Sequence, residues 1–214
     1  MKNAGVATTY ALGGNQKRIF DFMVALLALL WAFPLFICIA TLVKLSGPGP
    51  IIYKHTRIGL GGRRFSCFKF RTMIVDAENA LNVLLEVDPS ARTEWERCQK
   101  LVVDPRITPL GRFLRQTSFD ELPQIINVVR GEMSLVGPRP IAPSEVSRYG
   151  KWLGLYLSAR PGLTGAWQIS GRSDCGYDKR VELDISYVSD WCFSTDLFIL
   201  LRTVGAVAKR IGSY

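Results

Sequence analysis

The sequence predicts an α+β protein that is mainly helical, with an N-terminal membrane segment, a small β-hairpin and a helical head that carries interfacial amphipathic helices. Three observations predict this class. Residues 22–43 contain no charged residue, two strand-like runs follow a stretch of Gly and Pro, and many of the remaining apolar residues recur at helical spacing. We therefore divide the chain into a mobile tail at 1–16, a membrane segment at 17–45 and a head at 46–214.

The composition excludes a globally disordered chain and indicates anionic partners. The 214 residues include 27 Lys and Arg against 18 Asp and Glu, which gives a formal net charge of +9, and 48% of them are hydrophobic. The same positive charge favours nucleic acid, anionic lipid and phosphorylated substrates, so charge alone does not choose between them. The position of the apolar residues is needed to choose between these three kinds of partner.

Cysteine and histidine usage limits the metal and redox chemistry. The five cysteines are scattered without a C-x-x-C pair, so neither a zinc knuckle nor a disulfide framework fits, and a reducing compartment is the simpler interpretation. His55 is the only histidine and cannot supply a two-histidine metal site. We expect carboxylates and cations to carry the chemistry, with His55 as a minor candidate for a general base.

The charge-free run is long enough to cross a bilayer, because 22–43 would form a helix about 33 Å long. It is too long, and it starts too late, for a cleaved signal peptide. Basic residues lie on both sides of it, which places both ends in the cytoplasm by the positive-inside rule. Pro34 removes a backbone donor near the middle, so we expect a re-entrant helix hairpin broken near Pro34, with a kinked spanning helix as the alternative.

After the membrane segment the sequence predicts a hairpin and then several helices. Strand-like runs at 51–58 and 64–73 are separated by three glycines, and period-two alternation places Lys69 and Arg71 on one face. Capping and proline signals mark the helices that follow. They are expected at 76–87 with Asp76 as N-cap, at 90–102 with Ser90 as N-cap, from Thr108-Pro109, from Ser118 to Arg130-Gly131, at 178–190 and at 195–210.

Asp120 and Glu121 form an adjacent carboxylate pair within Ser118-Phe119-Asp120-Glu121. This spacing fits a capping box, in which Ser118 and Glu121 stabilise a helix start by about 1 kcal/mol. It also fits a nucleophile or a metal ligand whose negative charge is favoured by the positive end of the helix dipole. From these residues alone both interpretations stay open.

Several cations stand in unusual backbone settings in the sequence around this pair. Two lie on a strand, one precedes the pair, and three lie beside proline or glycine, which restricts their backbone. They are Lys69, Arg71, Arg115, Arg139, Arg160 and Arg172. A single surface arginine is usually solvated, but several on rigid turns beside paired carboxylates indicate a diphosphate site. The sequence contains no P-loop and no G-x-G-x-x-G after a strand, which disfavours the ordinary nucleotide-binding folds.

Five short motifs follow one another along the chain. They are Lys69-Phe70-Arg71-Thr72-Met73, Asp120-Glu121-Leu122-Pro123-Gln124, Gly137-Pro138-Arg139-Pro140, Arg160-Pro161-Gly162-Leu163-Thr164-Gly165 and Ser170-Gly171-Arg172. In this order they resemble the motifs of the bacterial sugar transferases, the monotopic polyprenyl-phosphate phosphoglycosyl transferases. The similarity extends from about Lys17 to Thr203, and five motifs in one order are highly specific.

The resemblance implies a membrane-embedded enzyme that transfers a sugar 1-phosphate from a UDP-sugar to undecaprenyl phosphate and releases UMP. It implies that Asp120 is the nucleophile of a covalent aspartyl-phosphosugar intermediate and that Glu121, with Asp120, is linked to Mg²⁺. It also implies that Pro34 breaks the re-entrant membrane helix and that Asp184 and Asp196 are supporting acids. The six cations above are expected to bind the substrate phosphates.

The finer resemblance is to exopolysaccharide-initiating hexose-1-phosphate transferases, with galactose or glucose as the expected hexose. It places the chain in the bacterial inner membrane with the catalytic head facing the cytoplasm. The partners it implies are UDP-sugar, undecaprenyl phosphate and the lipid bilayer, with no nucleic acid. The identity of the sugar and of the nucleotide, the polysaccharide pathway and the oligomeric state stay open, with a homodimer as one option. The chain has Phe119 where Leu is common in the family, and Phe33 where some relatives have Ser.

Two other functions compete with this one. A lipid-diphosphate hydrolase would use water in place of the lipid phosphate and would release free sugar phosphate. A membrane-tethered basic adaptor would bind nucleic acid or an assembly partner without catalysis, and it would not need Asp120.

Overall fold

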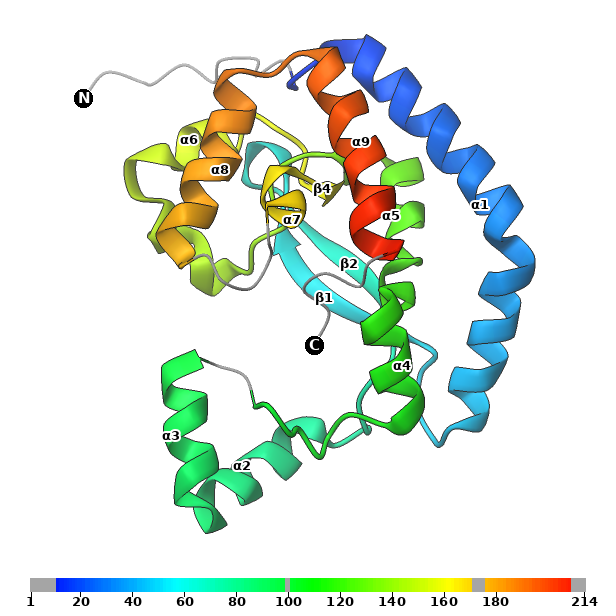
Figure 1. Ribbon diagram of the computed structural model, residues 1–214, viewed down its shortest axis with the longest axis vertical. Coiled ribbons are helices and arrows are strands. Elements are labelled where there is room, and N and C mark those ends of the chain that lie inside the picture. The colour runs from blue at the N-terminus through cyan, green and yellow to red at the C-terminus, as the bar shows by residue number, and fades with distance from the viewer. Residues whose placement is uncertain (1–10, 99–100, 171–175, 209–214) are drawn as a thin grey trace.

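The computed structural model describes residues 11–98, 101–170 and 176–208, and it is mainly helical with two small sheets (Figure 1). A long helix lies along one side, and the other elements form the head. The helices are α1 (Gly14–Leu45), α2 (Ala77–Val87), α3 (Pro89–Cys98), α4 (Pro109–Thr117), α5 (Gln124–Arg130), α6 (Leu153–Tyr156), α7 (Ala166–Ile169), α8 (Tyr177–Ser189) and α9 (Phe193–Ala208). The strands are β1 (Ile52–Ile58), β2 (Arg64–Phe70), β3 (Ser134–Val136) and β4 (Gly162–Thr164). The predicted class is confirmed in its coarse features: the described chain is mainly helical with a small hairpin, and its N-terminal membrane segment is one long apolar helix.

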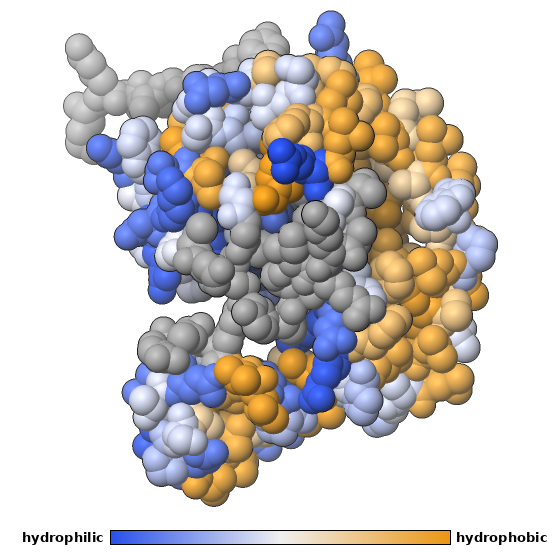
Figure 2. Space-filling view, in the orientation of Figure 1, coloured by the Kyte–Doolittle hydropathy of each residue, from blue (hydrophilic) through white to orange (hydrophobic). Residues whose placement is uncertain are grey.

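Helix α1 is long and apolar enough to cross a membrane, and most of its large side chains are exposed. Figure 2 shows apolar side chains along its length. We predicted a helix broken near Pro34, but α1 continues through Pro34 and bends instead (Figure 1). One proline removes a single donor from the helical ladder, and the intact hydrogen bonds on either side keep the helix together. The helix also begins at Gly14, inside the predicted tail, whose residues 1–10 lie outside the described chain.

The N-terminal end of α1 is attached to the head by buried charged groups. Lys17 pairs with Asp196 of α9, and both side chains are almost completely buried. Asp21 accepts a hydrogen bond of 2.7 Å from the Ser134 hydroxyl at β3. Arg18 donates to the last carbonyls of α5, at 2.6 and 2.8 Å. These contacts set the position of α1 along the head.

The predicted hairpin is confirmed as β1 and β2, which pair antiparallel from Ile52 opposite Phe70 to Ile58 opposite Arg64. The aromatic side chain of Phe70 is buried and lies 4.9 Å, between ring centroids, from Phe36 of α1. The hairpin is therefore packed directly on the C-terminal half of the membrane helix. This packing brings Lys69 and Arg71, which flank Phe70 in the sequence, close to that helix.

Most predicted helices are confirmed, although α5 begins at Gln124 and not at Ser118, and Asp76 precedes α2 without a side-chain capping hydrogen bond. Thr108 caps α4 by accepting from the Gly111 amide at 2.9 Å, and α5 ends at Gly131, whose φ of 80° is left-handed. Ser90 does not cap α3, because the Asp88 carboxylate accepts from the amides of Ser90 and Ala91 at 2.8 and 3.1 Å. Asp88 is the better N-cap here because its carboxylate reaches the first free amides of the helix.

The structure adds a short parallel pair, β3 and β4, that we did not predict. The two strands approach so closely that a Cβ atom at Gly162 would lie 2.2 Å from the backbone nitrogen of Gly137. A Cβ at Gly137 would in turn lie 2.4 Å from the Arg160 carbonyl oxygen. These two motif glycines are therefore required by backbone packing, and the contact brings the motif of Arg139 next to that of Arg160.

We expect Gly162→Ala to destabilise the protein, because the added methyl group meets backbone atoms that cannot rotate away. Overpacking of this kind typically costs about 1–3 kcal/mol of unfolding free energy. Thermal unfolding in detergent would measure it, with Gly154→Ala as the matched control. Gly154 lies in α6 with open space around its Cβ position, so that variant should melt at or above the wild-type temperature. Equal melting temperatures for the two variants would contradict the packing argument.

Candidate active site

The carboxylate pair lies in a single 3₁₀ turn, Phe119–Glu121, between α4 and α5. Ser118 before it has a left-handed φ of 59°, and its side chain makes no capping hydrogen bond to the described turn. The capping-box interpretation is therefore wrong. Asp120 is only 8% exposed, whereas Glu121 is more open. The turn presents one buried and one accessible carboxylate next to each other.

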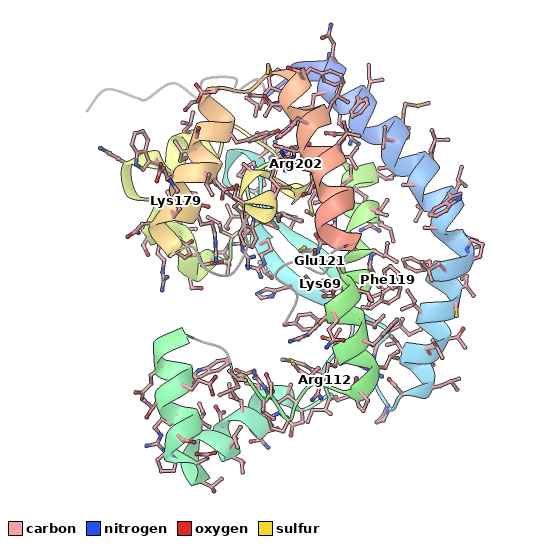
Figure 3. All side chains as sticks on the ribbon, in the orientation of Figure 1. Lys69, Arg112, Phe119, Glu121, Lys179 and Arg202 are labelled. Carbon is pink, nitrogen blue, oxygen red and sulfur yellow. The ribbon has the colours of Figure 1, made fainter. Side chains whose placement is uncertain are left out.

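Lys69 is the cation that the structure brings to this pair. Its Nζ lies 2.7 Å from Glu121 Oε1 and 3.5 Å from Asp120 Oδ2, and Figure 3 shows Lys69 and Glu121 side by side. Burial acts to lower the pKa of Lys69, but the two carboxylates raise it above its ordinary value. Lys69 is therefore fully charged at neutral pH and neutralises part of the negative charge of the pair.

The groups around Asp120 shift the pKa of its carboxyl group in opposite directions. Burial raises the pKa of its carboxyl group, and the adjacent charge of Glu121 adds to the rise, whereas Lys69 and Arg115 act in the opposite direction. Arg115 is oriented by a 3.0 Å hydrogen bond from its Nε to the Thr72 hydroxyl. Two cations therefore oppose the effect of burial on this carboxyl group.

Asn127 is a positioning residue that the sequence analysis did not identify. It is completely buried on α5, accepts from the Phe68 amide at 3.0 Å and donates to the Ser66 carbonyl at 2.8 Å. These bonds fasten α5 to β2, so they set the distance between Lys69 on the strand and Asp120 before the helix. The available signal was a single polar residue within the apolar run of residues 125–129.

Two of the arginines predicted to bind phosphate donate to backbone carbonyls at helix ends. Arg71 donates to the carbonyls of Val43 and Gly47, both at 2.9 Å, at the C-terminal end of α1. Arg160 donates from Nε to the Gly131 carbonyl at 3.0 Å, at the C-terminal end of α5. Neither has a described contact with Asp120. Arg172 lies outside the described residues.

The two predicted supporting acids are buried, and the structure does not bring them into contact with Asp120. Asp184 accepts from the Tyr149 hydroxyl at 2.8 Å and from the Arg139 amide at 3.3 Å. Asp196 accepts from Lys17 and, at 2.6 Å, from the Tyr187 hydroxyl. Asp184 therefore supports the backbone of Arg139, and Asp196 supports the attachment of α1.

The carboxylate pair fits the manner in which Mg²⁺ is usually bound. This ion commonly takes one or two carboxylates together with substrate phosphates and water. Asp120 and Glu121 supply two adjacent carboxylates, and within the described residues no three His, Cys, Asp or Glu side chains form a closed metal cage. The donor set is therefore suited to an ion that arrives with a phosphorylated substrate.

Asp184 should make stability depend on pH. Burial raises the pKa of this carboxyl group from 3.8 to about 7. Between these values the folded protein binds more protons than the unfolded chain, so this group stabilises fully below pH 3.8, and the contribution is lost as pH rises through 7. The slope is at most about 1.4 kcal/mol per pH unit.

Asp184→Asn should remove this dependence. In thermal unfolding between pH 5 and pH 8, the difference in melting temperature, variant minus wild type, should become more positive as pH rises. Asp178→Asn, at an exposed position of the same helix, is the control and should show a constant difference. A constant difference for Asp184→Asn would contradict the assigned titration.

Known proteins resemble this chain over nearly its whole length. The family described as bacterial sugar transferase matches residues 13–210. The exopolysaccharide production protein ExoY of Sinorhizobium fredii is 47% identical over 203 residues, which cover 95% of this chain and 90% of that protein. The undecaprenyl-phosphate galactose phosphotransferase of Salmonella typhimurium is 49% identical over 198 residues, covering 92% of this chain and 41% of that protein.

A third relative is the UDP-glucose:undecaprenyl-phosphate glucose-1-phosphate transferase of Escherichia coli. It is 40% identical over 196 residues, which cover 88% of this chain and 39% of that protein. The chain thus spans nearly all of ExoY and about two fifths of each phosphotransferase. These similarities confirm the resemblance carried by the five motifs: the chain belongs to the bacterial sugar transferase family and is a phosphoglycosyl transferase.

Proposed function

We propose that this enzyme transfers a hexose 1-phosphate, galactose or glucose, from a UDP-sugar to undecaprenyl phosphate and releases UMP. The reaction would be the first membrane step of exopolysaccharide assembly. The observation that carries the proposal is the buried Asp120 carboxylate, which has Glu121, Lys69 and Arg115 around it and follows Phe119, a residue packed on the apolar cluster that includes Ile39 and Val43 of α1. The names of the relatives, which include lipid-carrier galactose and glucose phosphotransferases, support the same reaction.

The proposed reaction has two displacements at one phosphorus. A carboxylate oxygen of Asp120 bonds to the β-phosphorus, the bond to the bridging oxygen breaks, and its electron pair leaves with UMP. An oxygen of undecaprenyl phosphate then bonds to the same phosphorus, and the bond to Asp120 breaks. No general base is required, because neither displacement needs a proton to be removed when a carboxylate attacks first and an ionised lipid phosphate attacks second.

The residues around Asp120 reduce the repulsion between the anionic nucleophile and an anionic diphosphate. Lys69 contributes a fixed positive charge 3.5 Å from the carboxylate, and Arg115 contributes a second one nearby. Glu121, together with Asp120, would hold Mg²⁺, which when bound supplies further charge neutralisation on the diphosphate. As the substrate approaches, Lys69 can exchange its contact with Glu121 for one with a phosphate oxygen.

The proposed location is the bacterial inner membrane, with α1 re-entrant and the head facing the cytoplasm. The exposed apolar surface of α1 and the basic residues on both sides of it support this topology. Helix α9 adds an exposed apolar face with Leu197, Phe198 and Leu201, whereas its opposite face buries Ile199. An interfacial α9 would hold the site near the level of the lipid phosphates.

Asp120→Asn should abolish transfer while the protein still folds, because the amide keeps the size of the side chain but cannot accept a phosphoryl group. Wild-type protein incubated with Mg²⁺ and UDP-galactose or UDP-glucose should gain the mass of one hexose phosphate in intact-protein mass spectrometry. The adduct should be absent from the variant and suppressed by a chelator.

The matched control for this experiment is Asp178→Asn, which removes an exposed carboxylate from α8 and should form the adduct normally. Near-normal turnover by Asp120→Asn would contradict the covalent mechanism. Release of free sugar phosphate in the presence of undecaprenyl phosphate, with no lipid-linked product, would instead favour the hydrolase.

Membrane topology can be tested with single cysteines. If α1 is re-entrant, Asn15→Cys and Pro50→Cys, each made in a chain without the native cysteines, should both resist an impermeant thiol reagent applied to intact spheroplasts. Both should react after lysis, which serves as the control. Labelling of only one of the two in intact spheroplasts would indicate a spanning helix and overturn the re-entrant topology.

A further inference from the structure

A second group of residues, away from the carboxylate pair, contains unsatisfied buried polar atoms. Five side-chain atoms of this group are buried and have no hydrogen-bond partner among the residues that the structure describes. They are Arg139 Nε, Trp167 Nε1, Gln168 Oε1, Tyr177 OH and Arg180 Nε. Buried polar atoms are nearly always paired, so several in one place indicate that a polar ligand occupies the site.

These side chains form a row in which cations and aromatic rings alternate. The Arg139 and Arg180 guanidinium carbons lie 4.9 and 4.8 Å from the centre of the Trp167 ring, and Arg180 also lies 5.1 Å from the Tyr177 ring. Arg148 continues the row beyond Tyr177, at 4.6 Å. Stacking fixes the planes of the guanidinium groups and leaves their N–H edges available for an acceptor.

The row carries more positive charge than its carboxylates balance. Glu145 lies 3.2 Å from Arg57 and 3.9 Å from Arg180, so one carboxylate faces two guanidinium groups. Burial, together with the neighbouring Arg139, lowers the pKa of both Arg57 and Arg180. The nearby Asp184 has a pKa of about 7 and balances only part of this charge at neutral pH. This excess suits a phosphate group.

One face of the hairpin connects the row to the carboxylate pair. Lys69 pairs with Tyr53 in the register, and His55 and Arg57 follow on the same face of β1. Tyr53 and Arg57 are four residues apart, which corresponds to about 13 Å along a strand. His55 lies between them, with its ring nitrogen 3.4 Å from Arg57. An extended nucleoside diphosphate is long enough to reach across such a span.

We propose that this row is the subsite for the nucleotide end of the donor. Arg139 and Arg180 would bind the phosphate that becomes part of the leaving nucleoside monophosphate, and Gln168 and Tyr177 would contact the base or ribose. The inference rests on the proposed function, since the sugar phosphate end would react at Asp120. It assigns nucleotide selectivity to α7 and the start of α8, away from the reacting carboxylate.

Calorimetric titration of UMP into the full chain in detergent, without donor sugar or lipid acceptor, tests the subsite. Arg180→Met should weaken UMP binding at least tenfold. The control is Lys179→Met, at the adjacent position of α8, because Lys179 (labelled in Figure 3) is exposed and pairs with the exposed Glu182. It should change the affinity less than twofold. Equal affinities of the two variants would overturn the subsite.

A second variant keeps the test valid if Arg180→Met folds poorly. Gln168→Leu removes one unpartnered atom without changing the charge, and it should weaken UMP binding at least threefold while pyrophosphate binding stays within twofold. Unchanged UMP binding would overturn the contact to the base or ribose. These titrations do not involve Asp120 chemistry. A chain that binds UMP through Arg180 but never forms the hexose phosphate adduct would contradict the proposed function and leave the subsite intact.

Discussion

The position of α1 relative to the head depends on buried charged contacts, because the largely apolar surface of this helix does not define a unique register. Lys17 pairs with Asp196, and Asp21 accepts from Ser134, at one end of the helix. Arg71 donates to backbone carbonyls at the other end. Removing either partner of such a pair leaves an uncompensated buried charge, which typically costs about 3–5 kcal/mol. The membrane helix and the head are therefore fixed to each other at two separated points.

This attachment positions the reactive groups through their chain neighbours. Phe119 precedes Asp120 and packs against the apolar cluster that α1 shares with the hairpin, and Figure 3 shows its side chain directed toward α1. Phe70 follows Lys69 and contacts Phe36 in the same cluster. Both the carboxylate and its cation are therefore placed by aromatic residues that pack on the membrane helix. For a lipid-linked acceptor, whose phosphate stays near the membrane surface, this connection controls the height of the site.

The elements that could be predicted from the sequence depend on short-range geometry: the hairpin turn, the Thr108 cap and the left-handed end of α5 at Gly131. The parallel pair β3–β4 could not be predicted, since each strand has only three residues and the pairing joins distant segments. The sequence also could not show that Arg71 and Arg160 donate to carbonyls at helix C-terminal ends. A helix C-terminus presents carbonyl oxygens with partial negative charge, so both kinds of site favour the same guanidinium group.

The cations near the hairpin differ in the carboxylates and hydrogen-bond acceptors that surround them, and this difference indicates different roles. Lys69 lies against two carboxylates, so its charge is largely compensated until a phosphate competes for it. Arg139 and Arg180 have buried Nε atoms without a hydrogen-bond partner in the described chain, and the Glu145 carboxylate that lies 3.9 Å from Arg180 is shared with Arg57, so their charge is compensated less than that of Lys69. A diphosphate approaching Asp120 would therefore be attracted first to Arg139 and Arg180, which would orient it before its far phosphorus reaches Asp120. Binding and chemistry are thus assigned to opposite ends of one hairpin face.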